Sequence, residues 1–168
     1  MFLRWPHNKA SLVYPVPPAP PTVVLVPWFR STRQIRVFPN GWSADAAALS
    51  PAAIAARWPQ LDDLIEGGIP SLTHAVIALA LSPEELLSET QRDRLWRAFR
   101  VPVFEQIVTE NGALLAAECE AHDGFHIEAP SLAFDPCCIE VKPCGCGRTT
   151  PRLKPTGMRV QAIAAYAR

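Results

Sequence analysis

Two short clusters of cysteine and histidine have the spacing of metal ligands. The first is Cys119-x-x-His122, and the second is Cys144-x-Cys146, which precedes Gly147 about 25 residues later. Three thiolates and one imidazole complete the tetrahedral shell that zinc prefers in structural sites. The sequence therefore predicts one zinc ion held by Cys119, His122, Cys144 and Cys146.

Other side chains compete for this shell. His126 is a second candidate for the histidine position, and the neighbouring Cys137 and Cys138 could also supply thiolates. Whichever four residues bind, a shell of four protein ligands leaves no position for water or substrate. The predicted metal is therefore structural, and we assign no catalytic residue.

Composition limits the protein to a few classes. The chain has 168 residues, of which 49% are hydrophobic, enough for one ordinary core. Its 18 prolines against 8 glycines predict short elements joined by stiff turns. No export signal or membrane span is evident, and an odd number of cysteines favours metal-bound or free thiols over disulfides. We expect a cytoplasmic protein.

Charge is distributed unevenly along a chain whose formal net charge is zero. Residues 1–44 carry a net charge of +5, residues 45–140 carry −11, and residues 141–168 carry +6. A basic patch around the second cysteine cluster raises a nucleic-acid-binding alternative, although aromatic side chains do not alternate with it. That patch comprises Lys142, Arg148, Arg152, Lys154 and Arg159.

The chain divides into three expected parts. Residues 1–44 form a proline-rich basic arm, in which residues 23–26 are a possible edge strand, because proline withholds backbone donors. Residues 45–153 form the zinc-binding core, and residues 154–168 form a C-terminal strand or tail. We expect an α+β fold: a small hairpin-rich sheet with two or three helices, cross-linked by the zinc site.

Proline and capping residues indicate where helices begin. Ser50-Pro51 predicts a helix over residues 52–58, followed by a short turn over residues 61–65. Ser82-Pro83 predicts a second helix that runs to Phe99, with a restart at Ser88. Three apolar side chains of this helix have core-facing spacing, namely Leu95, Trp96 and Phe99.

Strands are predicted where apolar and β-branched residues run between turn signals. Residues 74–81 are expected to form a buried strand. Residues 101–108 and 113–119 are expected to form a hairpin around the Asn111-Gly112 turn, which would place Cys119 at a strand end.

The cysteine segments carry a family resemblance. Residues 118–127 (ECEAHDGFHI) and 143–153 (PCGCGRTTPRL) resemble segments of the phenylacetate–CoA ligase-like family of adenylate-forming enzymes. The similarity extends over roughly residues 72–153. It implies part of the ligase fold, and zinc at this place, as in some family members.

The chain also departs from the family's pattern. The glycine-, serine- and threonine-rich loop that grips ATP has no counterpart in residues 1–80. Of the motif that contacts adenine and magnesium, only Thr109 and Glu110 match, so the resemblance assigns these two to a residual nucleotide site. We expect a non-catalytic binding or accessory module, whose partner is a full-length enzyme or another protein. The alternative is a degenerate CoA ligase with a nucleotide or acyl pocket.

Overall fold

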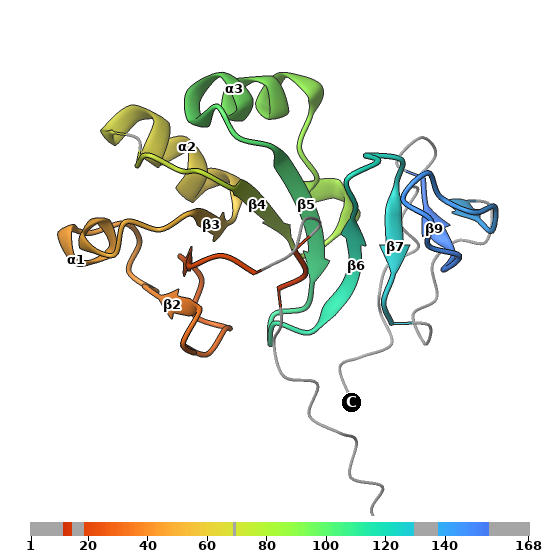
Figure 1. Cartoon of the computed structure of the whole chain (residues 1–168), viewed down its shortest axis with the longest axis horizontal. Coiled ribbons are helices and arrows are strands. Elements are labelled where there is room, and N and C mark those ends of the chain that lie inside the picture. The colour runs from red at the N-terminus through yellow and green to blue at the C-terminus, as the bar shows by residue number, and fades with distance from the viewer. Residues whose placement is uncertain (1–11, 15–18, 69, 130–137, 155–168) are drawn as a thin grey trace, which may run out of the picture.

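Parallel and antiparallel pairing divide one sheet into two parts (Figure 1). The computed structural model describes residues 12–14, 19–68, 70–129 and 138–154. Within these residues, nine strands form a sheet of order β2-β1-β3-β4-β5-β6-β7-β9-β8. Neighbours from β2 to β5 run parallel, and those from β5 to β8 run antiparallel. The strands are β1 (Thr22–Val24), β2 (Ile35–Val37), β3 (Ala53–Ala56), β4 (Ala75–Ala80), β5 (Val103–Val108), β6 (Leu114–Glu118), β7 (Phe125–Ile127), β8 (Ile139–Glu140) and β9 (Arg152–Leu153).

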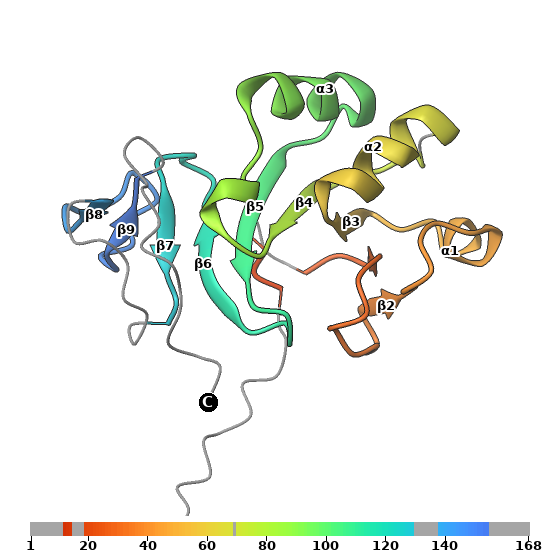
Figure 2. The ribbon, with the colours of Figure 1, turned by 180° about the vertical axis from the view of Figure 1, so that it is seen from behind.

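Helices cover one face of the parallel part (Figures 1 and 2). They are α1 (Ala44–Ala48), α2 (Trp58–Gly67) and α3 (Glu89–Phe99), and a short 3-10 helix, η1 (Pro83–Glu85), precedes α3. On this face, Leu61 and Leu95 pack with strand residues such as Ile54 and Val76 in one core cluster. A second cluster on the other face contains Ala55 and Ile77. The parallel strands are therefore buried on both faces, as α/β sheets require.

The sequence signals around α3 are largely confirmed. The side chain of Ser88 caps α3 and forms a capping box with Gln91, so the helix begins at the predicted restart. Leu95 and Phe99 are buried, but Trp96 is 51% exposed and lies near Arg100 instead of in the core. Trp96 therefore does not join the core stripe of the helix.

The helix predicted over residues 52–58 is instead strand β3 and the start of α2. Residues 53–56 are fully buried between β1 and β4. Small apolar side chains fit this position between two strands and two cores, so tertiary burial overrides the helix propensity of alanine. Pro59 lies in the first turn of α2, where its missing N–H costs nothing.

The neighbouring prolines predicted that residues 23–26 would be an edge strand, and that prediction is wrong. Strand β1 is internal, because it pairs with β2 on one side and with β3 on the other. The nearby prolines, such as Pro21 and Pro27, flank the strand without interrupting it. The strand predicted over residues 74–81 is confirmed as β4, and the β5–β6 hairpin is confirmed around Gly112, whose φ is 80°. Residues 155–168, expected as a strand or tail, lie outside the described residues.

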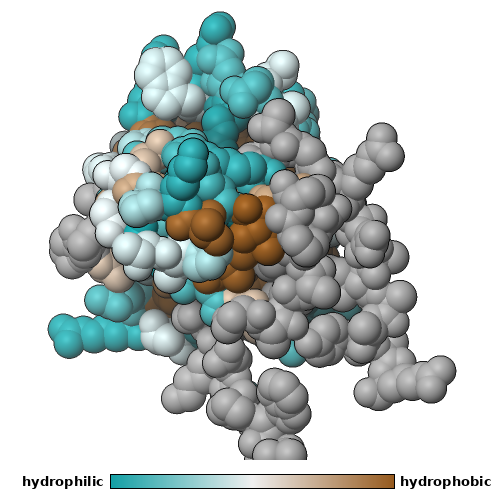
Figure 3. Space-filling view, turned by 90° about the vertical axis from the view of Figure 1, so that its right-hand side faces the viewer, coloured by the Kyte–Doolittle hydropathy of each residue, from teal (hydrophilic) through white to brown (hydrophobic). Residues whose placement is uncertain are grey.

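The antiparallel end of the sheet carries an apolar surface patch. Figure 3 views the molecule from this end and shows a group of hydrophobic residues next to hydrophilic ones. Val141, which follows β8, is 75% exposed. Of the helices in the described residues, none has the length and apolar character needed to cross a bilayer.

Candidate metal centre

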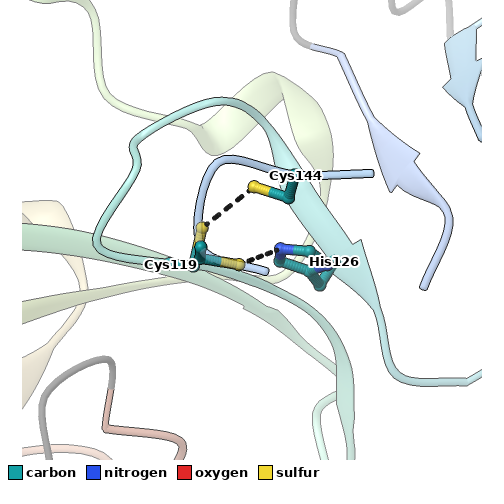
Figure 4. A group of neighbouring side chains, drawn as sticks. Cys119, His126 and Cys144 are labelled. Carbon is teal, nitrogen blue, oxygen red and sulfur yellow. Dashed lines mark hydrogen bonds between the residues drawn. The ribbon is translucent and has the colours of Figure 1, made fainter. Parts of the chain in front are cut away.

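Four side chains from three segments converge at the antiparallel end of the sheet. Three of them, Cys119, His126 and Cys144, are labelled in Figure 4. Cys119 follows β6, His126 is the middle residue of β7, and Cys144 and Cys146 lie in the turn between β8 and β9. One ligand atom from each residue lies within 4.8 Å of the others. We refer to these four residues as the thiol–imidazole cluster.

Close contacts within the cluster pair its members. The Sγ atoms of Cys119 and Cys144 are 3.6 Å apart, and Cys146 Sγ lies 3.3 Å from His126 Nε2. The other ring nitrogen of His126, Nδ1, is 2.7 Å from the hydroxyl oxygen of Thr150. This contact fixes the orientation of the ring and directs Nε2 toward the sulfurs, as a hydrogen bond to the other ring nitrogen does for histidines that bind metals.

Strand pairing explains why His126 completes the cluster. His126 lies opposite Ala117 in the β6–β7 register, and Ala117 shares a strand face with Cys119, two residues later. Asp123-Gly124, a strong hairpin signal, precedes β7, and Gly124 has a φ of 84°. Recognition of this turn in the sequence would have predicted β7 and placed His126 beside Cys119.

His122, the residue preferred from spacing, lies outside the cluster. Its backbone N–H donates to the carbonyl oxygen of Cys119 in a tight turn, and its φ is 48°. The ring stacks on Phe104 with centroids 4.9 Å apart, and its Nδ1 lies 3.1 Å from a Glu118 carboxylate oxygen. The turn therefore directs His122 to a separate set of contacts, and the alternative, His126, takes its place.

Backbone geometry shapes the turn that carries two of the sulfurs. The N–H of Cys144 donates to the carbonyl oxygen of Arg148, and the N–H of Gly147 donates to that of Cys144. Gly147 has a φ of 84°, a conformation that glycine adopts without strain. The turn therefore brings Cys144 and Cys146 to the same side.

Electrostatics set the protonation of the cluster before any metal binds. Burial raises the pKa of Cys119 to about 12. Burial also opposes ionisation of Cys144, but hydrogen bonds from the backbone N–H of Cys146 and from the neighbouring thiols lower its pKa overall. Burial, followed by the positive charge of Arg148, lowers the pKa of His126 and keeps its ring in the neutral form that binds metals.

A buried arginine connects the loops that carry the ligands. Arg152, on β9, is 2% exposed. Its guanidinium donates to the carbonyl and carboxylate oxygens of Asp123, to Glu140 at 2.6 Å, and to the carbonyl oxygen of Lys142 at 3.3 Å. Asp123 lies between Cys119 and His126, and Lys142 precedes Cys144, so Arg152 holds both ligand segments.

Most of the described residues in the basic patch, which suggested nucleic-acid binding, form ion pairs within the chain. Arg148 pairs with Glu128, and Lys154 pairs with Asp123 and Glu140. Arg152 is paired as well, so three cations of the patch already form ion pairs with carboxylates of the chain itself. Arg159 lies outside the described residues.

The two candidate nucleotide-binding residues lie at the opposite end of the hairpin from Cys119. Thr109 and Glu110 follow β5, at the carboxyl edge of the parallel strands, where α/β sheets usually bind ligands. The Thr109 hydroxyl is used within the turn, bonding with Asn111 and accepting from the N–H of Ala113. The hairpin separates this turn from Cys119 by roughly 20 Å, at about 3.4 Å per residue.

Comparisons with known proteins identify a fold relative. No protein-family model and no curated protein sequence matches the chain. Among solved structures, the chain is similar to 2-hydroxyisobutyryl-CoA ligase in an open conformation in complex with 2-HIB-AMP and CoA, with a TM-score of 0.57 and 14% identity. The match covers 84% of this chain and 45% of the ligase, so the chain spans less than half the length of that enzyme. At 14% identity, this similarity is evidence of a shared fold and not of a shared function.

Proposed function

We propose that this protein is a non-catalytic binding or accessory module whose antiparallel sheet is held together by one structural zinc ion. The observation that carries the proposal is the convergence of Cys119, His126, Cys144 and Cys146 within 4.8 Å. Three thiolates and an imidazole are a donor set that zinc favours, and four such ligands complete its shell. A completed shell leaves no position at which a substrate could be activated.

The position of the cluster supports a structural role. It lies beside the amino end of β5, whereas ligands of open α/β sheets bind at the carboxyl edge. The metal would join the end of β6, the middle of β7 and the turn before β9, three segments separated in the sequence. Its contribution is then to folding, as in other structural zinc sites.

The partner and compartment complete the proposal. Because the fold corresponds to part of an adenylate-forming CoA ligase, we propose a full-length enzyme or another protein as the partner. The three cysteines of the cluster form no disulfide, and thiolates bind metal only when reduced, so we propose a cytoplasmic location.

Metal analysis of matched histidine variants tests the zinc site. Protein purified under reducing conditions is expected to contain one zinc atom per chain. His126→Ala should lower zinc affinity by more than about 100-fold, because even outer-shell changes cost 10- to 100-fold. His122→Ala should bind zinc normally. Normal binding by His126→Ala, or protein purified without metal, would contradict the proposal.

A degenerate adenylate-forming enzyme is the second candidate, favoured by the fold similarity to a CoA ligase. In that case Thr109 and Glu110, at the carboxyl edge of β5, would contact the nucleotide. ATP–pyrophosphate exchange in the presence of aryl and small hydroxy acids separates the two candidates. A binding module gives no exchange, whereas exchange that Glu110→Gln abolishes would establish the enzyme.

A further inference from the structure

The sulfurs of the cluster are close enough to react with one another. Cys119 Sγ lies 3.6 Å from Cys144 Sγ and within 4.8 Å of Cys146 Sγ. A disulfide requires the two sulfurs to approach to about 2.05 Å, a movement that side-chain rotation and a small shift of the turn can supply. The same convergence that suits a metal therefore also suits a covalent bond.

Exposure distinguishes the three sulfurs. Cys119 and Cys144 are 3% and 6% exposed, whereas Cys146 is only partly buried. A small oxidant would therefore reach Cys146 first. Cys119 then lies beside it, on a different segment of the chain.

We propose that the cluster is a reversible oxidation site, at which a hydroperoxide replaces the metal cross-link with a disulfide between Cys119 and the Cys144–Cys146 turn. Release of zinc in this reaction rests on the proposed function; formation of the disulfide rests on the geometry alone. The oxidant belongs to the class of hydrogen peroxide and small organic hydroperoxides.

The reaction takes place in two steps. The Cys146 thiolate attacks the peroxide, an S–O bond forms as the O–O bond breaks, and hydroxide (or alkoxide) leaves. The sulfur of Cys119, as a thiolate or giving up its proton as it reacts, then attacks the Cys146 sulfur, so that an S–S bond forms and the S–O bond breaks with loss of a second hydroxide. Two electrons pass from the two sulfurs to the peroxide, and two protons convert the leaving groups to water or alcohol. With Cys119 and Cys146 joined, Cys144 and His126 alone would remain as ligands, and a zinc ion bound by the cluster would be released.

The cross-link keeps its place in the fold through this exchange. In either state a bond joins the end of β6 to the turn between β8 and β9. Subsequent thiol–disulfide exchange with Cys144, whose sulfur is 3.6 Å from that of Cys119, leaves the two segments joined. Oxidation is therefore expected to release the metal without unfolding the sheet.

The test uses a Cys137→Ser/Cys138→Ser background, first shown to melt as the parent protein does, so that three thiols remain. Zinc-loaded protein is treated with hydrogen peroxide while a chromogenic chelator records free metal. We expect one zinc released per disulfide, peptide mapping that joins Cys119 to Cys146 or Cys144, and full reloading after dithiothreitol and zinc are added. Cys146→Ser should slow disulfide formation at least tenfold.

The metal-free protein makes this test independent of the zinc proposal. Reduced metal-free protein treated with peroxide should form the same disulfide and melt at a higher temperature than the untreated sample, because the bond constrains the unfolded chain. A disulfide between Cys144 and Cys146, bonds between chains, or direct conversion to sulfinic acid would overturn the proposal. Protein that never binds zinc but forms the mapped disulfide would overturn only the proposed function.

Discussion

Glu105 is a buried carboxylate at the junction of α3, β5 and β6. Its side chain is 4% exposed and pairs with Arg92, while its Oε1 accepts the N–H of Leu87 at 2.7 Å. Glu118, the residue before Cys119, also pairs with Arg92 and accepts the N–H of Glu105. Two carboxylates, one of them next to Cys119 in the sequence, therefore share one guanidinium.

This arrangement predicts an unusual pH dependence of stability. Burial raises the pKa of Glu105 despite the lowering effects of Leu87 and Arg92. The folded state then binds a proton more tightly than the unfolded state. The free energy of unfolding should accordingly decline as pH rises from the ordinary glutamate pKa of about 4.3 through the raised value. Glu105→Gln cannot ionise and should decline less, as measured by urea unfolding across this range.

Glu110→Gln is the matched control, because Glu110 is exposed in the β5–β6 turn. It should follow the parent protein at every pH. Should Glu105→Gln also retain the full decline, the buried carboxylate would not be the titrating group.

At the residue scale, the sequence predicted the sulfurs of the cluster and preferred the wrong one of two candidate imidazoles, His122 over His126. Cysteines in a short glycine turn, such as Cys144 and Cys146, need only local geometry to converge. The choice between His122 and His126 depends on the β6–β7 pairing and on the positive φ of His122. Spacing alone carries neither piece of information.

Two serines before α3 differ in what their side chains do. Ser88 Oγ accepts the N–H of Gln91 at 3.3 Å, and Gln91 Oε1 accepts the N–H of Ser88 at 2.8 Å. Ser82, before η1, makes no side-chain capping bond, although Glu85 stands three residues after it as a capping box would require. The helix begins at the serine whose hydroxyl is used.

Substitution of each serine measures this difference. Ser88→Ala should lower the free energy of unfolding by about 1 kcal/mol, since it removes the cap of α3. Ser82→Ala should change it by less than about 0.5 kcal/mol, as ordinary surface substitutions do. Chemical unfolding of both variants checks the prediction. Equal losses would show that capping does not set where α3 begins.

At the element scale, strong local signals predicted secondary structure correctly, whereas burial in the sheet overrode weak ones. The Asn111-Gly112 turn and the Ser88 cap are local, and both elements form where they were predicted. Residues 53–56 are mostly alanine, whose helix preference is small beside the burial that β1 and β4 impose. That burial comes from strands that are distant in the sequence, so a prediction made from neighbouring residues alone could not include it.

The whole molecule combines two parts that are stabilised differently. The parallel strands lie between two apolar clusters, one of them under the helices. The antiparallel end has a smaller cluster, around Ile107, Phe125 and Leu153, and strands of only two or three residues in β7, β8 and β9. Such short strands bury little surface, so we expect the Arg152 ion pairs and the proposed zinc ion to supply much of their stability.

Removal of the metal should therefore loosen the antiparallel end before the rest. Hydrogen–deuterium exchange with and without a zinc chelator measures this at each segment. We expect faster amide exchange in β7 and β9 and in the Cys144–Cys146 turn, while β3 and β4 keep their protection, because local opening has a lower free energy where fewer apolar contacts must break. His126→Ala should reproduce this pattern without chelator. If amide exchange accelerates equally in β4 and β7, the two parts unfold as one unit. If exchange in β7 is unchanged by the chelator, a metal does not hold this end of the sheet.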